Sequence, residues 1–104
     1  MRSLQAKQFM TIKKGAVLVI DIRRESDYDS SEDVIPGAAW KDPEKVEEWM
    51  GSLPTEEPVI VYCVRGGGIS NSVVDKLQAN NVDARFIEGG IEGLKEAGGL
   101  VERK

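Results

Sequence analysis

Apolar runs along the chain predict the strands of a central sheet. Residues 17–22 and 58–63 are almost continuously apolar and rich in β-branched side chains, which is the pattern of strands buried on both faces. Residues 84–87 form a shorter run, and residues 39–40 are expected to form a brief extended piece after a turn.

The stretches between these runs predict helices. Apolar residues recur at helical spacing within residues 3–14, 71–78 and 91–97. Asp42 followed by Pro43 is typical of a helix start, with Asp42 as the capping residue. Strands that alternate with helices predict an α/β fold with a mostly parallel sheet and helices on both faces.

Length and composition narrow the classes of protein. With 104 residues, the chain is expected to form one domain, residues 1–104. Its net charge of -4, without any long basic run, argues against a nucleic-acid partner. No apolar run approaches the ~20 residues that a membrane-spanning helix needs, and no secretory signal is visible at the N-terminus. We therefore expect no membrane partner.

The chain holds one cysteine and no histidine. A single cysteine cannot form an internal disulfide, which fits a reducing compartment, and we expect a cytoplasmic protein. The absence of histidine excludes Cys–His pairs, Ser-His-Asp triads and histidine-based metal sites. We expect neither a metal nor a cofactor.

The cysteine, Cys63, lies where a predicted strand runs into a glycine-rich loop and then a helix. Sites in open parallel sheets lie at the carboxyl ends of strands, and Asp21 and Arg23 lie at the same end of the first strand. The amides of residues 64–69 can turn toward the sulfur, the helix directs its positive end at it, and Arg65 adds a full charge. These features predict a stabilised thiolate or persulfide at Cys63.

Structural explanations stay open for these residues. A lone cysteine at a strand end is often a small buried hydrophobe, and glycines before a helix can serve only to make a tight turn. Asp21 and Arg23 are expected to be supporting residues, with Arg23 paired to Asp27 and Asp21 accepting hydrogen bonds from the loop. Ser70 is expected to cap the next helix rather than act as a nucleophile.

Motifs across residues 17–99 resemble those of the rhodanese (sulfurtransferase) family. Any one of them alone would be a weak signal, but their shared order is highly specific. The motifs are Val19-Ile20-Asp21-Ile22-Arg23, Asp27-Tyr28, Ile35-Pro36-Gly37-Ala38, Val61-Tyr62-Cys63-Val64-Arg65-Gly66, and Glu88-Gly89-Gly90-Ile91-Glu92-Gly93 with Lys95-Glu96-Ala97-Gly98 after it.

The resemblance implies a single-domain sulfurtransferase. Cys63 would attack the outer sulfur of a small-molecule donor, such as thiosulfate or a persulfide, and carry that sulfur as its own persulfide. The acceptor would be cyanide, a thiol or another protein. Arg65 would hold the sulfonate oxygens of the donor. The substrate-binding residues would be those of the loop: Val64, Arg65, Gly66, Gly67, Gly68 and Ile69.

The chain departs from the family pattern in and around the loop. Val34 precedes the Ile-Pro turn where relatives often carry His or Arg, and Gly68 stands where many carry Arg. Leu94 replaces a frequent Trp. The loop is therefore less cationic than is usual in the family, with Arg65 as its only charge, and donor preference stays open.

Other functions remain alternatives. A cysteine phosphatase or arsenate reductase on the same scaffold would carry Arg six positions after the cysteine to grip its anion bidentately, and this chain has Ile69 there. A non-catalytic binding module, or a protein-to-protein sulfur carrier, is not separated from an enzyme by the residues alone.

Overall fold

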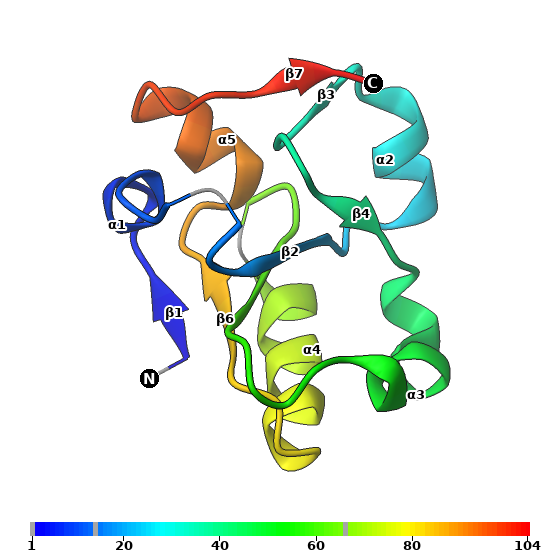
Figure 1. Cartoon of the computed structure of the whole chain (residues 1–104). Coiled ribbons are helices and arrows are strands. Elements are labelled where there is room, and N and C mark those ends of the chain that lie inside the picture. Colours follow the sequence, from blue (N-terminus) through cyan, green and yellow to red (C-terminus); the bar gives the residue numbers. More distant parts are fainter. Residues whose placement is uncertain (1, 14, 66) are drawn as a thin grey trace.

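A parallel sheet of five strands lies at the centre of the structure, a computed structural model that describes residues 2–13, 15–65 and 67–104 (Figure 1). The elements in chain order are β1 (Ser3–Leu4), α1 (Ala6–Met10), β2 (Leu18–Asp21), α2 (Glu25–Ser30), β3 (Asp33–Val34), β4 (Ala39–Trp40), η1 (Pro43–Lys45), α3 (Val46–Trp49), η2 (Met50–Ser52), β5 (Val59–Tyr62), α4 (Gly68–Ala79), β6 (Ala84–Ile87), α5 (Gly90–Glu96) and β7 (Glu102–Arg103).

The strands lie in the order β1-β6-β5-β2-β4, and every neighbouring pair is parallel. Strand β5 is therefore central, with β2 and β6 on either side. The three apolar runs of the sequence form these three middle strands, which confirms the predicted α/β fold. The helix start at Asp42 is also confirmed, since its carboxylate accepts a hydrogen bond from the Glu44 N–H at 2.9 Å.

The side chains of β5 alternate between two hydrophobic clusters, one on each face of the sheet. Val59 and Val61 pack with residues of α3 and α4, whereas Ile60 and Tyr62 pack with residues of α1 and α5. All four side chains are at most 2% exposed. Because helices cover both faces, the strand is apolar throughout instead of alternating with polar residues.

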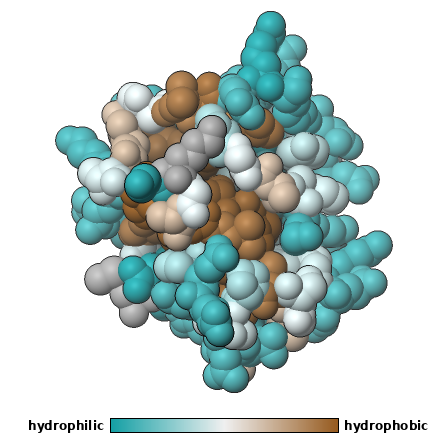
Figure 2. All heavy atoms as spheres, in the orientation of Figure 1, coloured by the Kyte–Doolittle hydropathy of each residue, from teal (hydrophilic) through white to brown (hydrophobic). Residues whose placement is uncertain are grey.

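Hydrophobic residues also reach the surface over a limited area. Figure 2 shows them gathered toward the middle of the face in view, with hydrophilic side chains around them. The large hydrophobic residues that are exposed in the described ranges are Met10 and Leu100. Within those ranges, no helix combines the length and apolar character that crossing a membrane requires.

The N-terminal prediction was wrong in part. Residues 3–14 do not form one helix: β1 is an edge strand, only α1 is helical, and Lys14 lies outside the described residues. The Leu4 carbonyl accepts a hydrogen bond from the Glu88 N–H at 2.9 Å, and the Leu4 side chain is buried. Ladder hydrogen bonds and burial outweigh the local helical pattern here.

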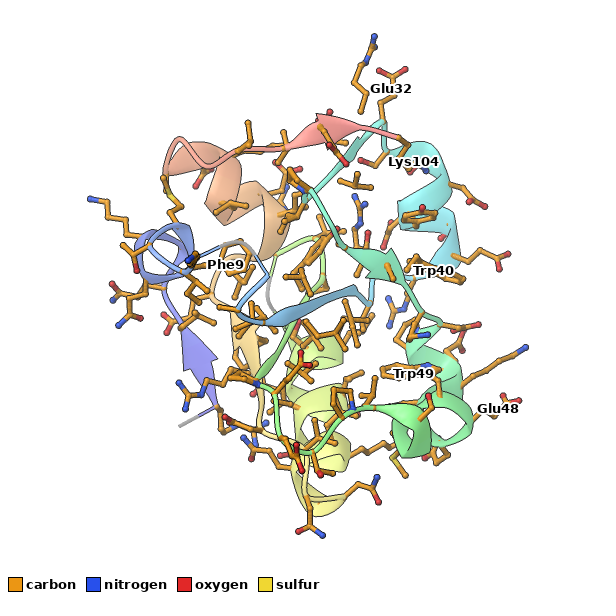
Figure 3. The ribbon with its side chains drawn as sticks, in the orientation of Figure 1. Phe9, Glu32, Trp40, Glu48, Trp49 and Lys104 are labelled. Carbon is orange, nitrogen blue, oxygen red and sulfur yellow. The ribbon has the colours of Figure 1, made fainter. Side chains whose placement is uncertain are left out.

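A small antiparallel ribbon, β3 with β7, was not predicted. It brings the C-terminus beside α2, where the Lys104 ammonium lies 3.9 Å from the centre of the Tyr28 ring. Trp40, from β4, stacks on the same ring with 5.4 Å between centroids, and Figure 3 shows Trp40 and Lys104 on this side of the molecule. Neither β3 nor β7 has a hydrophobic pattern from which it could be predicted.

Candidate active site

Cys63 directly follows β5, at the carboxyl end of the central strand. Its side chain is only 7% exposed, yet it lines a surface pocket of about 520 Å³. The thiol is therefore recessed but reachable from solvent. The prediction that Cys63 lies at the carboxyl end of a buried parallel strand is thus confirmed.

The pocket joins the loop after Cys63 to the segment that follows β2. Arg24 and Asp27 line it from that segment, and Ser72 lines it from α4. Sequence reasoning did not name Arg24, Asp27 or Ser72 as site residues. The available signal for Arg24 was its place next to Arg23, beyond the carboxyl end of β2. The predicted residues that line the pocket are Cys63, Val64, Arg65, Gly67, Gly68, Ile69 and Arg23, and Gly66 lies outside the described residues.

The rim of the pocket carries two arginines that form no ion pair within the described part of the chain. Arg24 and Arg65 are exposed, and neither takes part in the ion pairs found there. Asp27 contributes one negative charge to the same pocket. The rim therefore favours an anion.

Ser70 does not cap the helix, contrary to the prediction. Helix α4 begins at Gly68 with Gly67 in the capping position, so Ser70 is the third helical residue. Its side chain is fully buried, and its Oγ donates a hydrogen bond to Cys63 Sγ at 3.1 Å. The sulfur thus lies within reach of the first turn of a 12-residue helix, whose positive end favours negative charge.

Asp21 and Arg23 form a buried ion pair, and the predicted partner of Arg23, Asp27, was wrong. The Arg23 Nη2 and Nε atoms donate to Asp21 Oδ2 at 2.7 and 3.0 Å, and both residues are at most 2% exposed. The backbone N–H of Arg23 donates to Asp21 Oδ1 at 2.9 Å, and the Tyr62 hydroxyl donates to Oδ2 at 3.0 Å. Among the described residues, the hydrogen bonds that Asp21 accepts thus come from Arg23 and Tyr62 and not, as had been predicted, from the loop after Cys63.

The positive charge of Arg23 is neutralised by Asp21 within this network. Burial alone would lower the pKa of Arg23, but the hydrogen bonds and charge of Asp21 outweigh it and raise the pKa above its ordinary value. Arg23 also donates to the Asp33 carbonyl at 3.0 Å, and its own carbonyl accepts from Trp40 Nε1 at 2.8 Å. Although Arg23 borders the pocket, its guanidinium is hydrogen-bonded to Asp21 and to the Asp33 carbonyl.

Helix α5 holds the backbone of the cysteine loop. The N–H of Ile91 donates to the Cys63 carbonyl at 3.0 Å, and the N–H of Glu92 donates to the Val64 carbonyl at 3.1 Å. Gly90 permits this contact, because a Cβ at that position would lie 2.3 Å from the Cys63 carbonyl oxygen. Its φ of +61° also favours glycine.

Comparison with known families decides the identity of the fold. A family model described as the rhodanese-like domain matches residues 5–97, which is most of the chain. The chain belongs to the rhodanese-like family. No functionally curated protein is a significant match to the chain.

Solved structures of the same fold superpose on all or nearly all of the chain. A rhodanese-related protein from Thermoplasma volcanium is 24% identical, with a TM-score of 0.85 and 100% of both chains covered. A rhodanese-like domain protein from Staphylococcus aureus is 25% identical, with a TM-score of 0.79 and coverage of 100% of this chain and 99% of its own. A protein of unknown function from Rhodopseudomonas palustris, described as a "possible tyrosine phosphatase", is 21% identical, with a TM-score of 0.79 and coverage of 98% and 85%.

The rhodanese-like motifs converge around Cys63 for physical reasons. The Ile35 N–H, in the Ile-Pro-Gly-Ala turn, donates to the Tyr62 hydroxyl at 3.3 Å and so joins the Asp21 network. In the glycine-rich C-terminal motif, Gly89 occupies the capping position before α5 with a φ of +81°, and Gly90 lies against the cysteine loop. Motifs that are far apart in sequence thus support one strand end.

We predict that Gly90→Ala displaces the cysteine loop and lowers the free energy of unfolding by about 3 kcal/mol, since the new Cβ meets backbone atoms. Gly98→Ala is the matched control. Gly98 has a similar φ, +85°, but a Cβ there meets nothing within 4 Å. The control should cost only about 1 kcal/mol. Urea unfolding of both variants measures the difference, and equal losses would contradict the proposed contact.

We also predict that Tyr62 makes the fold sensitive to alkali. Burial and the charge of Asp21 raise the pKa of Tyr62 above its ordinary value. Above pH ~10 the unfolded chain loses the phenolic proton of Tyr62, while the folded protein keeps it. The free energy of unfolding therefore does not vary with the titration of this group below that pH and falls by about 1.4 kcal/mol per pH unit above it.

The variant Tyr62→Phe tests this sensitivity. It should be less stable than wild type by about 1–3 kcal/mol at neutral pH, because Asp21 and the Ile35 N–H each lose a partner. Between pH 9.5 and 11 that gap should narrow, as measured by urea unfolding. A gap that stays constant over this pH range would contradict the role of the Tyr62 proton.

Proposed function

We propose that this rhodanese-like protein is a sulfurtransferase that forms a persulfide on Cys63. In the first half-reaction, the Cys63 thiolate attacks the outer sulfur of thiosulfate, the bond between the two donor sulfurs breaks, and sulfite leaves with its electron pair. In the second, cyanide or a thiolate attacks the outer sulfur of the persulfide, the sulfur–sulfur bond breaks, and the electron pair returns to Cys63 Sγ. No external oxidant or reductant is consumed.

One observation carries this proposal: a recessed cysteine lines an anion-favouring pocket and receives a hydrogen bond on its sulfur. The pocket, of about 520 Å³, has ample room for a small oxyanion donor beside Cys63. Arg24 and Arg65 border it from different segments, so a dianionic donor would meet positive charge from two directions. The loop amides and the start of α4 would stabilise the anionic forms of the sulfur.

The pocket supports a phosphatase less well. The position six residues after Cys63 is Ile69, which lines the pocket with an apolar side chain where a phosphatase needs a guanidinium. The likeness to the Rhodopseudomonas palustris protein, at 21% identity, extends only to the fold. The protein should therefore release no phosphate from an aryl phosphate such as p-nitrophenyl phosphate.

We predict that thiosulfate adds one sulfur atom to the intact protein and that Cys63→Ser abolishes the addition. Mass spectrometry of the intact protein measures the adduct, and subsequent cyanide should remove it with formation of thiocyanate. A protein that binds partners without chemistry would show no adduct, and this result would contradict the proposed function. A sulfur carrier would show the adduct but would pass it to cyanide slowly compared with a protein thiol.

We predict that Arg65→Ala weakens the use of thiosulfate by about two- to fivefold, which is the size expected for one exposed charge pair. The use of a neutral persulfide donor should change little, because that donor has no sulfonate. The ratio of kcat/KM values for the two donors measures the effect.

Lys76→Ala is the matched control for the loss of one positive charge. Lys76 lies on α4 and pairs with Glu47, and it does not line the pocket. This control should leave the donor ratio unchanged. An equal loss of both donors in Arg65→Ala would remove Arg65 from the proposed sulfonate site.

A further inference from the structure

The hydrogen bond between Ser70 and Cys63 supports the proposed function, but the proposed function does not say which step of the reaction it assists. The donor, Ser70 Oγ, lies 3.1 Å from Cys63 Sγ, and the Ser70 side chain is fully buried while Cys63 is 7% exposed. A hydroxyl buried beside a nucleophilic sulfur is sheltered from competing water. Its hydrogen bond therefore acts in a medium where electrostatic interactions are strong.

The hydroxyl of Ser70 hydrogen-bonds to the cysteine sulfur, whereas serine side chains within helices commonly hydrogen-bond to a backbone carbonyl one turn earlier. The carbonyl of Gly67, three residues earlier, accepts from the backbone and side-chain N–H groups of Asn71, at 3.2 and 3.3 Å. Ser70 lies on the first turn of α4, and its hydroxyl points at the sulfur.

We propose that Ser70 is a positioning residue that stabilises negative charge on Cys63 Sγ and so assists the departure of the sulfur from the persulfide. The second part rests on the proposed sulfur transfer. A hydrogen bond donated to a charged acceptor favours the charged form over the neutral one.

The two half-reactions move charge in opposite directions at Sγ. When Cys63 takes up sulfur, its thiolate charge moves to the outer sulfur, and Sγ becomes a neutral, weak acceptor. When the outer sulfur is removed, the electron pair returns to Sγ, where the Ser70 hydroxyl again meets a full charge. The hydrogen bond therefore strengthens toward the transition state of release and weakens toward that of uptake.

This asymmetry predicts different effects of Ser70→Ala on the two steps. A thiolate that loses its donor becomes a poorer leaving group but a slightly better nucleophile. Release of sulfur to cyanide should slow by about three- to tenfold, because the transition state loses part of the free energy that a hydrogen bond to a charged group contributes. Uptake from thiosulfate should not slow at alkaline pH, where the thiolate is fully formed in both proteins.

The first measurement needs no sulfur donor. The rate of alkylation of Cys63 by iodoacetamide, followed against pH, reports the fraction of thiolate. In Ser70→Ala the curve should move to higher pH, with a rate at neutral pH about tenfold lower, and it should meet or exceed the wild-type rate at high pH. Ser70→Thr keeps a hydroxyl on the same Cβ and should restore the wild-type curve.

The second measurement separates the half-reactions by rapid mixing. Protein charged with thiosulfate is mixed with cyanide, and thiocyanate formation gives the rate of release. Val74→Ala is the matched control, because Val74 lies one turn along α4, is fully buried and does not line the pocket. It should lower stability without changing the ratio of release to uptake.

Each result decides the inference. Overlapping alkylation curves for wild type and Ser70→Ala, the same shift in Val74→Ala, or the same shift in Ser70→Thr as in Ser70→Ala would overturn the role of the hydroxyl. If the wild-type protein takes up no sulfur at all, the proposed function fails, while the alkylation curves still decide whether Ser70 stabilises the thiolate.

Discussion

Helix α5 fixes the peptide groups that follow β5. The two segments are far apart in sequence, because α4 and β6 lie between them. Backbone hydrogen bonds from Ile91 and Glu92 reach the carbonyls of Cys63 and Val64. The two backbones approach so closely that no space remains for a Cβ at position 90, and glycine at that position allows the contact. A loop rich in glycine would otherwise be free to sample many conformations. The position of the sulfur therefore depends on a backbone contact that the loop cannot provide for itself.

The buried Asp21–Arg23 pair supports the same edge of the sheet from the side of β2. Taking two charges out of water is costly, and such a pair is tolerated only where further hydrogen bonds complete it. Tyr62 and the Arg23 backbone supply those bonds to Asp21, and the Asp33 carbonyl accepts from Arg23. Since Tyr62 immediately precedes Cys63, the network sets the geometry of the strand end. It also explains why Arg23, though cationic and beside the pocket, is not free to pair with an anion there.

The sequence was most informative where burial on both faces leaves a continuous apolar run. Residues 17–22, 58–63 and 84–87 therefore predicted the three middle strands, and the place of Cys63 at a strand end followed from them. Prediction failed where only tertiary contacts decide. β1 is stabilised by its hydrogen bonds to β6 at the edge of the sheet, and the two residues Ser3–Leu4 have no pattern that predicts this pairing. The spacing that suggested a bond between Arg23 and Asp27 applies within a helix, whereas Arg23 precedes α2. Ser70 was placed outside its helix because glycines concealed the true start of α4.

The recessed position of Cys63 has a consequence for the behaviour of the chain toward itself. A disulfide requires the Cβ atoms of two cysteines to come within about 4 Å of one another. With only 7% of its surface exposed, the lone thiol of one molecule cannot approach its counterpart in a second molecule that closely without a rearrangement of both pockets. Covalent dimers are thereby disfavoured in oxidising surroundings. A macromolecule that exchanges atoms with this thiol has to present its own reactive group on a slender, projecting segment.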